Sequence, residues 1–351
     1  MSDRRKEAEE KMAKAIFISA DCWLSVFDLL PAYQLGLGIS MISHRFDFYV
    51  DEHFKTRKWT LALIRIRNKI GENGTDEMEI INFGQKALPI PPIQLPRKVS
   101  GFQRIEICFI DQNAIAFLCH FRQLFAACPI NLVLYIHNDC ISELILRNTW
   151  PMLGKNIHFI ELPARIFRLL RQFAPSALND CPSLRVVSFF FDDIFPEFPA
   201  DDNATASDGQ VLAKWLFTPL QNGVPKVLIC QFNMDDANWM SRIEAFQAAF
   251  ASASSTVNFI VVIWFPSYFD DVDFVVPFEQ INEMTREQLA LKLIDDCMKR
   301  MNINNQCFVL VRCPIARDES KWTKWEKEAI HWCIYDEPNQ IFLLTESDQQ
   351  K

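Results

Sequence analysis

Six short segments of this chain share one apolar template, and that repetition constrains the fold more than any other feature. In each segment an apolar residue is followed three and five positions later by two more, as in Phe102-x-x-Ile105-x-Ile107. The other five copies begin at Ile130, Ile157, Leu184, Val224 and Val257. Successive copies start 28, 27, 27, 40 and 33 residues apart, which leaves room for one helix between neighbouring strands. Strand, helix and strand at this spacing predict a parallel sheet with right-handed crossovers.

Apolar periodicity and capping residues place helices in the intervals between these strands. Ser207 and Gln210 have the spacing of a capping box, and Thr285 with Gln288 has the same spacing. The second box predicts a helix carrying Ala290, Ile294, Cys297 and Met301. The other predicted helices span residues 113–128, 141–152, 164–173, 211–217 and 237–251.

Two α/β architectures fit this pattern. The first three intervals lie in the range of leucine-rich repeats, which favours a degenerate leucine-rich-repeat-like array with later insertions. The asparagine that such repeats carry is present in the second copy alone, as Asn138. An ordinary doubly wound α/β domain is therefore the alternative.

A second apolar stretch, Ile18 to Phe54, precedes the array. Ser19 is placed to cap a helix that Pro31 ends, and apolar residues at helical spacing predict two further short helices. Three short helices cannot bury all this apolar surface among themselves, so we expect part of it to meet a partner.

The order of residues in this stretch resembles an F-box, the module that docks on the Skp-type adaptor of SCF ubiquitin ligases. The resemblance rests on Val26-Phe27-x-x-Leu30-Pro31, then Gln34-Leu35, then Ile42-Ser43-His44-Arg45-Phe46. It implies that nine residues bind the adaptor: Leu24, Val26, Phe27, Leu30, Pro31, Leu35, Ile39, Ile42 and Phe46. A helical hairpin that caps a larger domain is the plainer alternative.

Residues 257–293 and 308–332 resemble the carboxy-terminal part of a large family of F-box proteins of plant-parasitic nematodes. The family implies a non-catalytic substrate-recognition subunit that binds a Skp-type adaptor and the cullin ligase core, in the cytoplasm or nucleus. An unknown protein target would be held by the carboxy-terminal α/β domain. The alternative is an interaction scaffold whose F-box no longer recruits a ligase, because Ser19 and Phe54 stand where an F-box usually has proline and tryptophan.

The expected domain organisation has four parts. A charged helix spans residues 1–15, and the F-box spans 16–56. Residues 57–101 hold two strands, 58–67 and 78–83, and a proline-rich linker. The leucine-rich-repeat-like domain spans 102–346.

Composition and motifs exclude several function classes. Thirty-six basic against 44 acidic residues give a net charge of −8, which argues against nucleic acid as a partner. No apolar run approaches the roughly 18 residues that span a bilayer, so we expect no membrane contact. Nine glycines, no phosphate-binding loop and no metal-ligand spacing among the six histidines predict no catalytic residue, cofactor or metal. The eleven cysteines are interpreted as small buried hydrophobes of a reducing compartment.

Two aromatic features have structural and functional interpretations. Trp322, Trp325 and Trp332 share a helix face and are predicted to be core anchors that pack on a last strand, Ile341 to Leu344. The acidic segment 195–202 contains two phenylalanines and is a weak candidate for partner contact.

Overall fold

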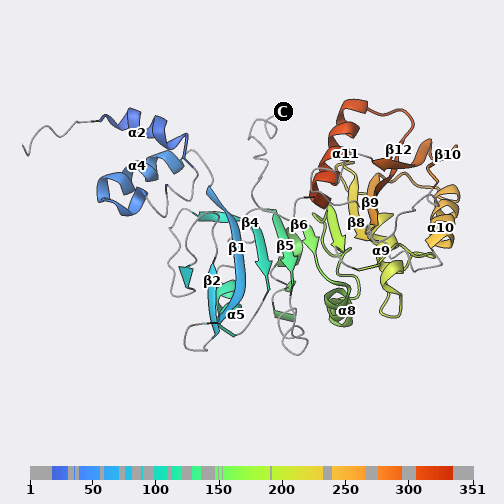
Figure 1. The fold of residues 1–351 in the computed structure, drawn as a ribbon, viewed down its shortest axis with the longest axis horizontal. Coiled ribbons are helices and arrows are strands. Elements are labelled where there is room, and N and C mark those ends of the chain that lie inside the picture. Colours follow the sequence, from blue (N-terminus) through green and yellow to red (C-terminus); the bar gives the residue numbers. More distant parts are fainter. Residues whose placement is uncertain are drawn as a thin grey trace, which may run out of the picture. The chain divides into compact units, whose positions relative to one another are not determined.

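The protein is described by a computed structural model over part of its length. The described residues are 18–30, 35, 39–55, 59–70, 76–80, 88–89, 99–108, 112–120, 129–135, 147–148, 150–151, 153–189, 192–231, 239–265, 276–294 and 306–334. The chain divides into two compact units (Figure 1). The helical unit comprises residues 1–61 and 92–101, and the sheet unit comprises residues 62–91 and 102–351.

The helical unit contains α2 (Ala20–Phe27), the 3-10 helix η1 (Ile39–Met41) and α4 (His44–Lys55). Ser19 caps α2, because its hydroxyl oxygen accepts a hydrogen bond from the Cys22 backbone N–H at 3.4 Å. The serine therefore has a local structural role at the start of α2.

Twelve strands within the described residues form one sheet. They are β1 (Trp59–Ile70), β2 (Asp76–Ile80), β3 (Leu88–Pro89), β4 (Val99–Ile107), β5 (Ile130–Leu134), β6 (Ile157–Glu161), β7 (Val186–Phe189), β8 (Lys226–Gln231), β9 (Phe259–Phe265), β10 (Phe278–Asn282), β11 (Glu287–Ile294) and β12 (Gln306–Pro314). Their spatial order is β10-β11-β12-β9-β8-β7-β6-β5-β4-β1-β2-β3. The hairpin of β1 and β2 thus belongs to the same sheet as the array.

The six copies of the apolar template form strands β4 to β9. Each of these strands pairs in parallel with the next one along the chain. The prediction of a mostly parallel α/β sheet is confirmed. Because the order runs from β4 to β9 without reversal, these strands lack the switch point of a doubly wound sheet. The strands β12, β11 and β10 then continue the sheet from β9 in antiparallel pairs.

The helices of the sheet unit agree with most of the predicted ranges. They are α5 (Gln112–His120), η2 (Gly154–Asn156), α8 (Ala164–Phe173), α9 (Asp208–Leu216), α10 (Trp239–Ala251) and α11 (Glu319–Ile334). The capping box before α9 is confirmed: Gln210 N–H donates to Ser207 Oγ at 3.0 Å, and Ser207 N–H donates to Gln210 Oε1 at 2.9 Å. Most of the predicted helix 141–152 lies outside the described residues, although 147–148 and 150–151 are helical.

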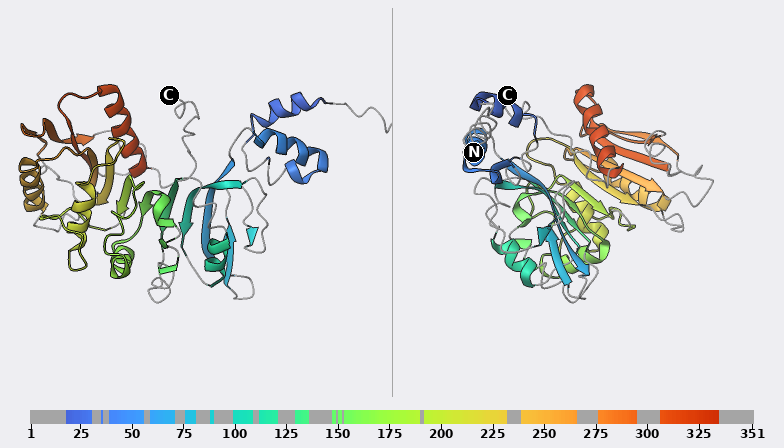
Figure 2. Two further views of the ribbon diagram at one scale, coloured as in Figure 1. Left: turned by 180° about the vertical axis from the view of Figure 1, so that it is seen from behind. Right: turned by 60° about the vertical axis from the view of Figure 1, so that its left-hand side comes forward.

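Helices cover the two faces of the sheet unequally. On one face, Phe167 of α8 packs on Phe189 of β7, and Phe246 of α10 packs on Phe259 of β9, with ring centroids 5.3 and 5.6 Å apart. The opposite face is covered by α11, which follows β12 (Figure 2). Its buried residues Trp322 and Ala329 join a core cluster with alternate residues of β8, β9 and β12.

The helix predicted from Thr285 is wrong. Residues 283–286 form a turn in which Arg286 has a φ of 57°, and Glu287 to Ile294 form β11. Within β11, Leu289 and Leu291 are buried at strand spacing, and pairing with β10 and β12 determines the structure. The capping-box spacing at Thr285 predicts a helix, whereas the alternating apolar residues that follow it are typical of a strand. Pairing with the neighbouring strands outweighed the helix preference of the capping residues.

The tryptophans of α11 are core anchors, as predicted. Trp322 is buried, and Trp325 and Trp332 pack against the same cluster. Trp332 also stacks on Phe159 of β6, with ring centroids 4.9 Å apart. The predicted strand Ile341 to Leu344 lies outside the described residues.

The acidic segment 195–202 packs closely on α9. The Phe198 ring lies edge-on to Phe217 and Phe246, and Phe195 is buried. A Cβ atom at Gly209 would lie 2.6 Å from the Phe195 carbonyl oxygen, so this close approach requires glycine. The two phenylalanines of this segment therefore contribute to the core.

Candidate functional site

The helical unit has a small core of its own. Phe27 of α2, Leu35 and Val50 of α4 are each 1% exposed. Seven half-buried apolar residues pack around them: Trp23, Leu24, Leu30, Ile39, Phe46, Tyr49 and Phe54. Phe54 therefore contributes to the packing of the unit.

The nine residues predicted to bind an adaptor occupy different environments. Phe27 and Leu35 lie in the core, so their part in docking would be to keep the unit folded. Val26 and Ile42 are 43% and 62% exposed and are accessible to a partner. Pro31 lies outside the described residues. The other four, Leu24, Leu30, Ile39 and Phe46, are half-buried against the core.

Three further apolar side chains of the helical unit are more than half exposed and were not singled out from the sequence. They are Leu29, Met41 and Phe48, with exposed fractions between 59% and 83%. Residues 23–30 contain more apolar positions than one stripe of a short helix can bury. This excess in the sequence indicates that some apolar side chains of α2 and the turn after it stay exposed. We refer to Val26, Leu29, Met41, Ile42 and Phe48 as the exposed apolar set.

The sheet unit offers a second candidate surface, on the face that carries α11. Strand register places Glu106, Val133 and Glu161 beside one another on neighbouring strands, and Ser188 follows on β7. The same row continues into the apolar residues of β8, β9 and β12 that α11 covers. The face therefore changes from apolar to polar on passing from β8 toward β4.

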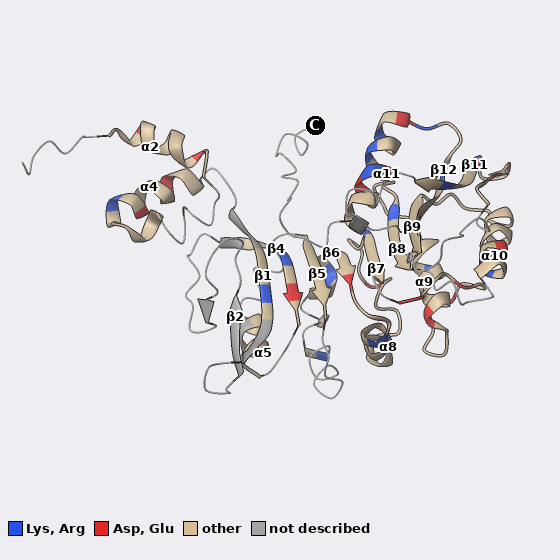
Figure 3. Ribbon diagram, in the orientation of Figure 1, with Lys and Arg blue, Asp and Glu red and all other residues tan. Residues whose placement is uncertain are grey.

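The polar part of this face is built from paired charges. Glu106 lies between two arginines: its Oε1 accepts from Arg104 Nε at 2.8 Å, and its Oε2 accepts from Arg65 Nε. The Glu106 side chain is 4% exposed, whereas those of Arg65 and Arg104 are 30% and 17% exposed. On the other side of Val133, the Tyr135 hydroxyl donates to Glu161. Figure 3 shows basic and acidic segments together on β4, and a basic segment on β1. We refer to Arg65, Arg104, Glu106, Tyr135 and Glu161 as the polar row.

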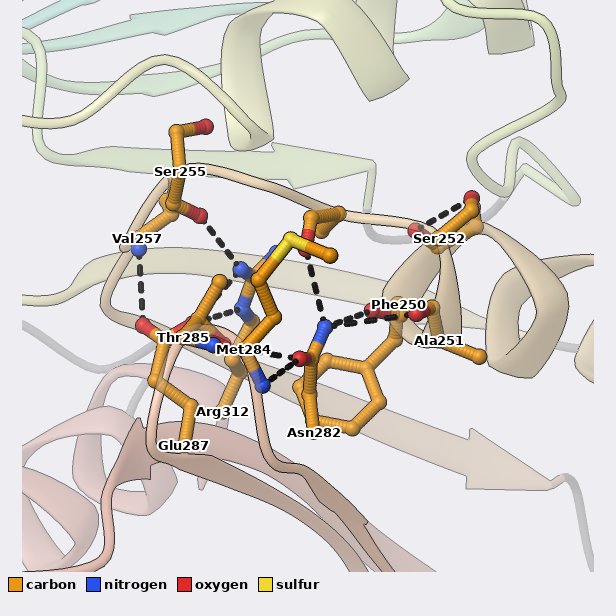
Figure 4. Close-up of polar contacts among 12 residues, drawn as sticks. Phe250, Ala251, Ser252, Ser255, Val257, Asn282, Met284, Thr285, Glu287 and Arg312 are labelled. Atoms are coloured by element: carbon orange, nitrogen blue, oxygen red, sulfur yellow. Dashed lines mark hydrogen bonds and ion pairs between the residues drawn. The ribbon is translucent and has the colours of Figure 1, made fainter.

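A second polar cluster, shown in Figure 4, is built around the buried side chains of Arg312, Glu287 and Asn282. Arg312 of β12 donates to Glu287 of β11 from Nη2 at 2.6 Å and from Nε at 3.1 Å, and neither side chain is exposed. Glu287 also accepts from the Val257 backbone N–H at 2.8 Å. Asn282 donates to the Phe250 and Ala253 carbonyls at the end of α10. These contacts tie α10 and β9 to the β10–β11 hairpin, which is a structural role.

Two basic side chains of the sheet, Lys226 and His158, have a lowered pKa. Burial lowers the pKa of Lys226 to about 7, and its Nζ donates to the Trp215 carbonyl at 2.5 Å, near the end of α9. Burial, and then the nearby Arg185 guanidinium, lower the pKa of His158. The Lys226 side chain thus forms a contact between β8 and α9.

The described residues contain neither a metal-binding cluster nor a membrane-spanning helix. No group of three or more His, Cys, Asp or Glu side chains in this part of the chain is placed to hold a metal ion. None of the helices among these residues is long and apolar enough to cross a bilayer.

Comparison of the whole chain with family models, with curated proteins and with solved structures gave no match.

Proposed function

We propose that this protein is a non-catalytic substrate-recognition subunit of an SCF-type E3 ubiquitin ligase. The observation that carries the proposal is the exposed apolar set on a separately cored helical unit whose sequence has the residue order of an F-box. These five large apolar side chains are accessible on a small unit, so a protein partner could bury them. In this proposal a Skp-type adaptor covers them, and the cullin core joins through the adaptor.

The sheet unit would hold the protein target. The unreversed order of β4 to β9, with α8 and α10 packed on one face, supports a degenerate leucine-rich-repeat-like arrangement. In such arrangements the face without crossover helices is the one available for binding. The polar row lies on that face beyond α11, and its partly exposed arginines can pair with acidic groups of a target.

The experiment is co-purification of the full chain with a Skp-type adaptor, followed by measurement of the dissociation constant. The test variant is Val26→Asp/Ile42→Asp, because both residues are exposed and both match the F-box order. Two anchors worth about 2 kcal/mol each predict at least a roughly hundredfold weaker affinity. The matched control is Met284→Asp, which places the same charge at a 75% exposed apolar position of the sheet unit.

Leu35→Ala separates folding from docking, because Leu35 is 1% exposed in the core of the helical unit. Circular dichroism of this variant should show lost helix content, whereas Val26→Asp/Ile42→Asp should retain it. Failure of the unaltered chain to retain the adaptor at micromolar concentration would contradict the proposal. The scaffold interpretation, with an F-box that recruits no ligase, would then replace it.

A further inference from the structure

Helix α11 crosses the sheet in the direction of the polar row. Trp322, near the start of the helix, packs in a cluster that includes residues of β9 and β12. Further along, Glu328 accepts from Nη2 of Arg185, the residue before β7, at 3.0 Å, and Trp332 stacks on Phe159 of β6. The helix therefore passes over the strands in their spatial order, and its axis continues toward β5 and β4.

Strand register places Arg104 directly ahead of this helix. Phe159 pairs with Asn131 of β5, and Asn131 pairs with Arg104 of β4. Neighbouring strands lie about 4.8 Å apart, so Arg104 is two strands, or about 10 Å, beyond Phe159. Paired residues point to the same side of a sheet, so all three lie on the face that carries α11.

The Arg104 guanidinium has N–H groups that the described part of the chain does not satisfy. Among these residues it makes one hydrogen bond, from Nε to Glu106 Oε1 at 2.8 Å, and its two Nη groups donate to none of them. The Arg104 side chain is only 17% exposed. Guanidinium N–H groups that are largely kept from water need acceptors, and one carboxylate can accept from two of them at once.

Two carboxylates follow α11 in the sequence. Asp336 and Glu337 lie four and five residues after Trp332, and residues 335–350 contain no lysine or arginine. Five residues span about 7 Å as a helix and up to about 17 Å when extended, which brackets the distance of about 10 Å to β4. Pro338 favours extended backbone at the residue before it, Glu337.

We propose that the segment following α11 crosses β5 and that its acid pair, Asp336 and Glu337, binds the Arg104 guanidinium, so that the chain covers part of its own polar row. Glu106 balances one charge of the two arginines that it joins, Arg65 and Arg104, and one carboxylate of the segment balances the other. Neighbouring side chains of an extended segment point to opposite sides, so one of the two acids faces the sheet in either register.

The consequence for target binding rests on the proposed function. An acidic target segment held at Arg65 and Arg104 would need the guanidinium that the acid pair of this chain already occupies. The segment following α11 is then a competitor within the same chain, and a target binds by displacing it.

Carbodiimide cross-linking of the full chain tests the contact. Arg104→Lys keeps the charge and supplies an amine that an activated carboxylate can acylate. Mass spectrometry should find position 104 linked to Asp336 or Glu337, and the added change Asp336→Asn/Glu337→Gln should abolish the link. Gln103→Lys is the matched control, because it places the amine on the opposite face of β4. No link in Arg104→Lys, or an equal yield in Gln103→Lys, would overturn the proposal.

A fluorescent hexaglutamate peptide tests the competition without altering the sheet. Asp336→Asn/Glu337→Gln should bind this peptide about threefold more tightly than the unaltered chain, because breaking a partly exposed ion pair frees the guanidinium. Glu346→Gln/Asp348→Asn removes the same charge from the same segment and should bind like the unaltered chain. Equal affinities of the two double variants would refute the competition.

The two experiments separate this proposal from the proposed function. The cross-link requires neither an adaptor nor a target, so its absence would leave the ligase proposal standing. A cross-link in a chain that fails to retain the adaptor would have the opposite meaning: the contact would stand and the ligase proposal would fall.

Discussion

The buried pair of Arg312 and Glu287 allows a quantitative test of the packing described above. Glu287→Ala removes the carboxylate that faces Arg312 and that accepts from the Val257 N–H. The guanidinium keeps the Ser255 carbonyl at 2.8 Å and lies over the rings of Phe217, Phe250 and Phe259, but its charge loses its counterion. Breaking one side of a buried ion pair costs about 3–5 kcal/mol, because an uncompensated charge stays out of water. We expect Glu287→Ala to reduce the free energy of unfolding by roughly 4 kcal/mol.

Removing both charges should cost much less than removing one. In Glu287→Leu/Arg312→Met, apolar side chains of similar length replace the pair between the phenylalanine rings. Such replacements are often neutral, so we expect a loss of about 1 kcal/mol or less. The single variants Glu287→Leu and Arg312→Met, together with the double variant, form a double-mutant cycle for the pair.

Urea denaturation followed by tryptophan fluorescence is the assay. Trp215, Trp264 and Trp322 lie buried in the sheet unit, so the signal reports that unit. A loss below about 1 kcal/mol for Glu287→Ala would refute the reasoning, since the pair would then not be a buried ion pair in solution. A double variant as unstable as the single variant would show instead that the apolar surroundings cannot pack without the charges.

Two further predictions concern α9 and its neighbours. Alanine in place of glycine usually stabilises a helix by about 1 kcal/mol. Gly209→Ala should nevertheless destabilise the protein, because the new Cβ atom would lie 2.6 Å from the Phe195 carbonyl oxygen. A raised thermal midpoint for this variant would contradict the packing of residues 195–197 on α9. The pKa of Lys226 falls from 10.5 to about 7 on folding, so the unfolded chain binds the proton more tightly. The free energy of unfolding should therefore fall as the pH is lowered from about 10 toward 7. Lys226→Met should weaken this pH dependence of the unfolding free energy in urea titrations, and an unchanged pH dependence would show that the Lys226 amine is solvated.

Much of the sheet could be predicted because its determinants are local and repeated. The six apolar templates became β4 to β9, and α8 and α9 lie close to their predicted ranges. The strand order followed from the handedness and length of the crossovers. By contrast, β10 to β12 form an antiparallel extension, and the sequence pattern near Thr285 was equally compatible with a helix. The strand that begins at Glu287 is fixed in part by the pairing of Glu287 with Arg312, a partner 25 residues away.

The candidate surfaces were harder to predict because they depend on which apolar residues the fold leaves uncovered. Phe27 and Val26 are adjacent in α2, yet one is in the core and the other is exposed. Residue type alone does not distinguish them. The polar row posed a different difficulty: Arg65 and Glu106 are 41 residues apart, and only the pairing of β1 with β4 brings them together.

The position of α11 explains why the polar row lies where it does. The face opposite the crossover helices is apolar on β8, β9 and β12, and such a face must be buried to be stable. The chain meets this need by returning across the face with α11, whose Trp332 reaches as far as Phe159 of β6. An apolar helix over Glu106 and Glu161 would carry a desolvation cost without supplying hydrogen bonds. A partner on this part of the face would meet the partly exposed guanidinium groups of Arg65 and Arg104, which makes an acidic protein segment a better ligand than an apolar one.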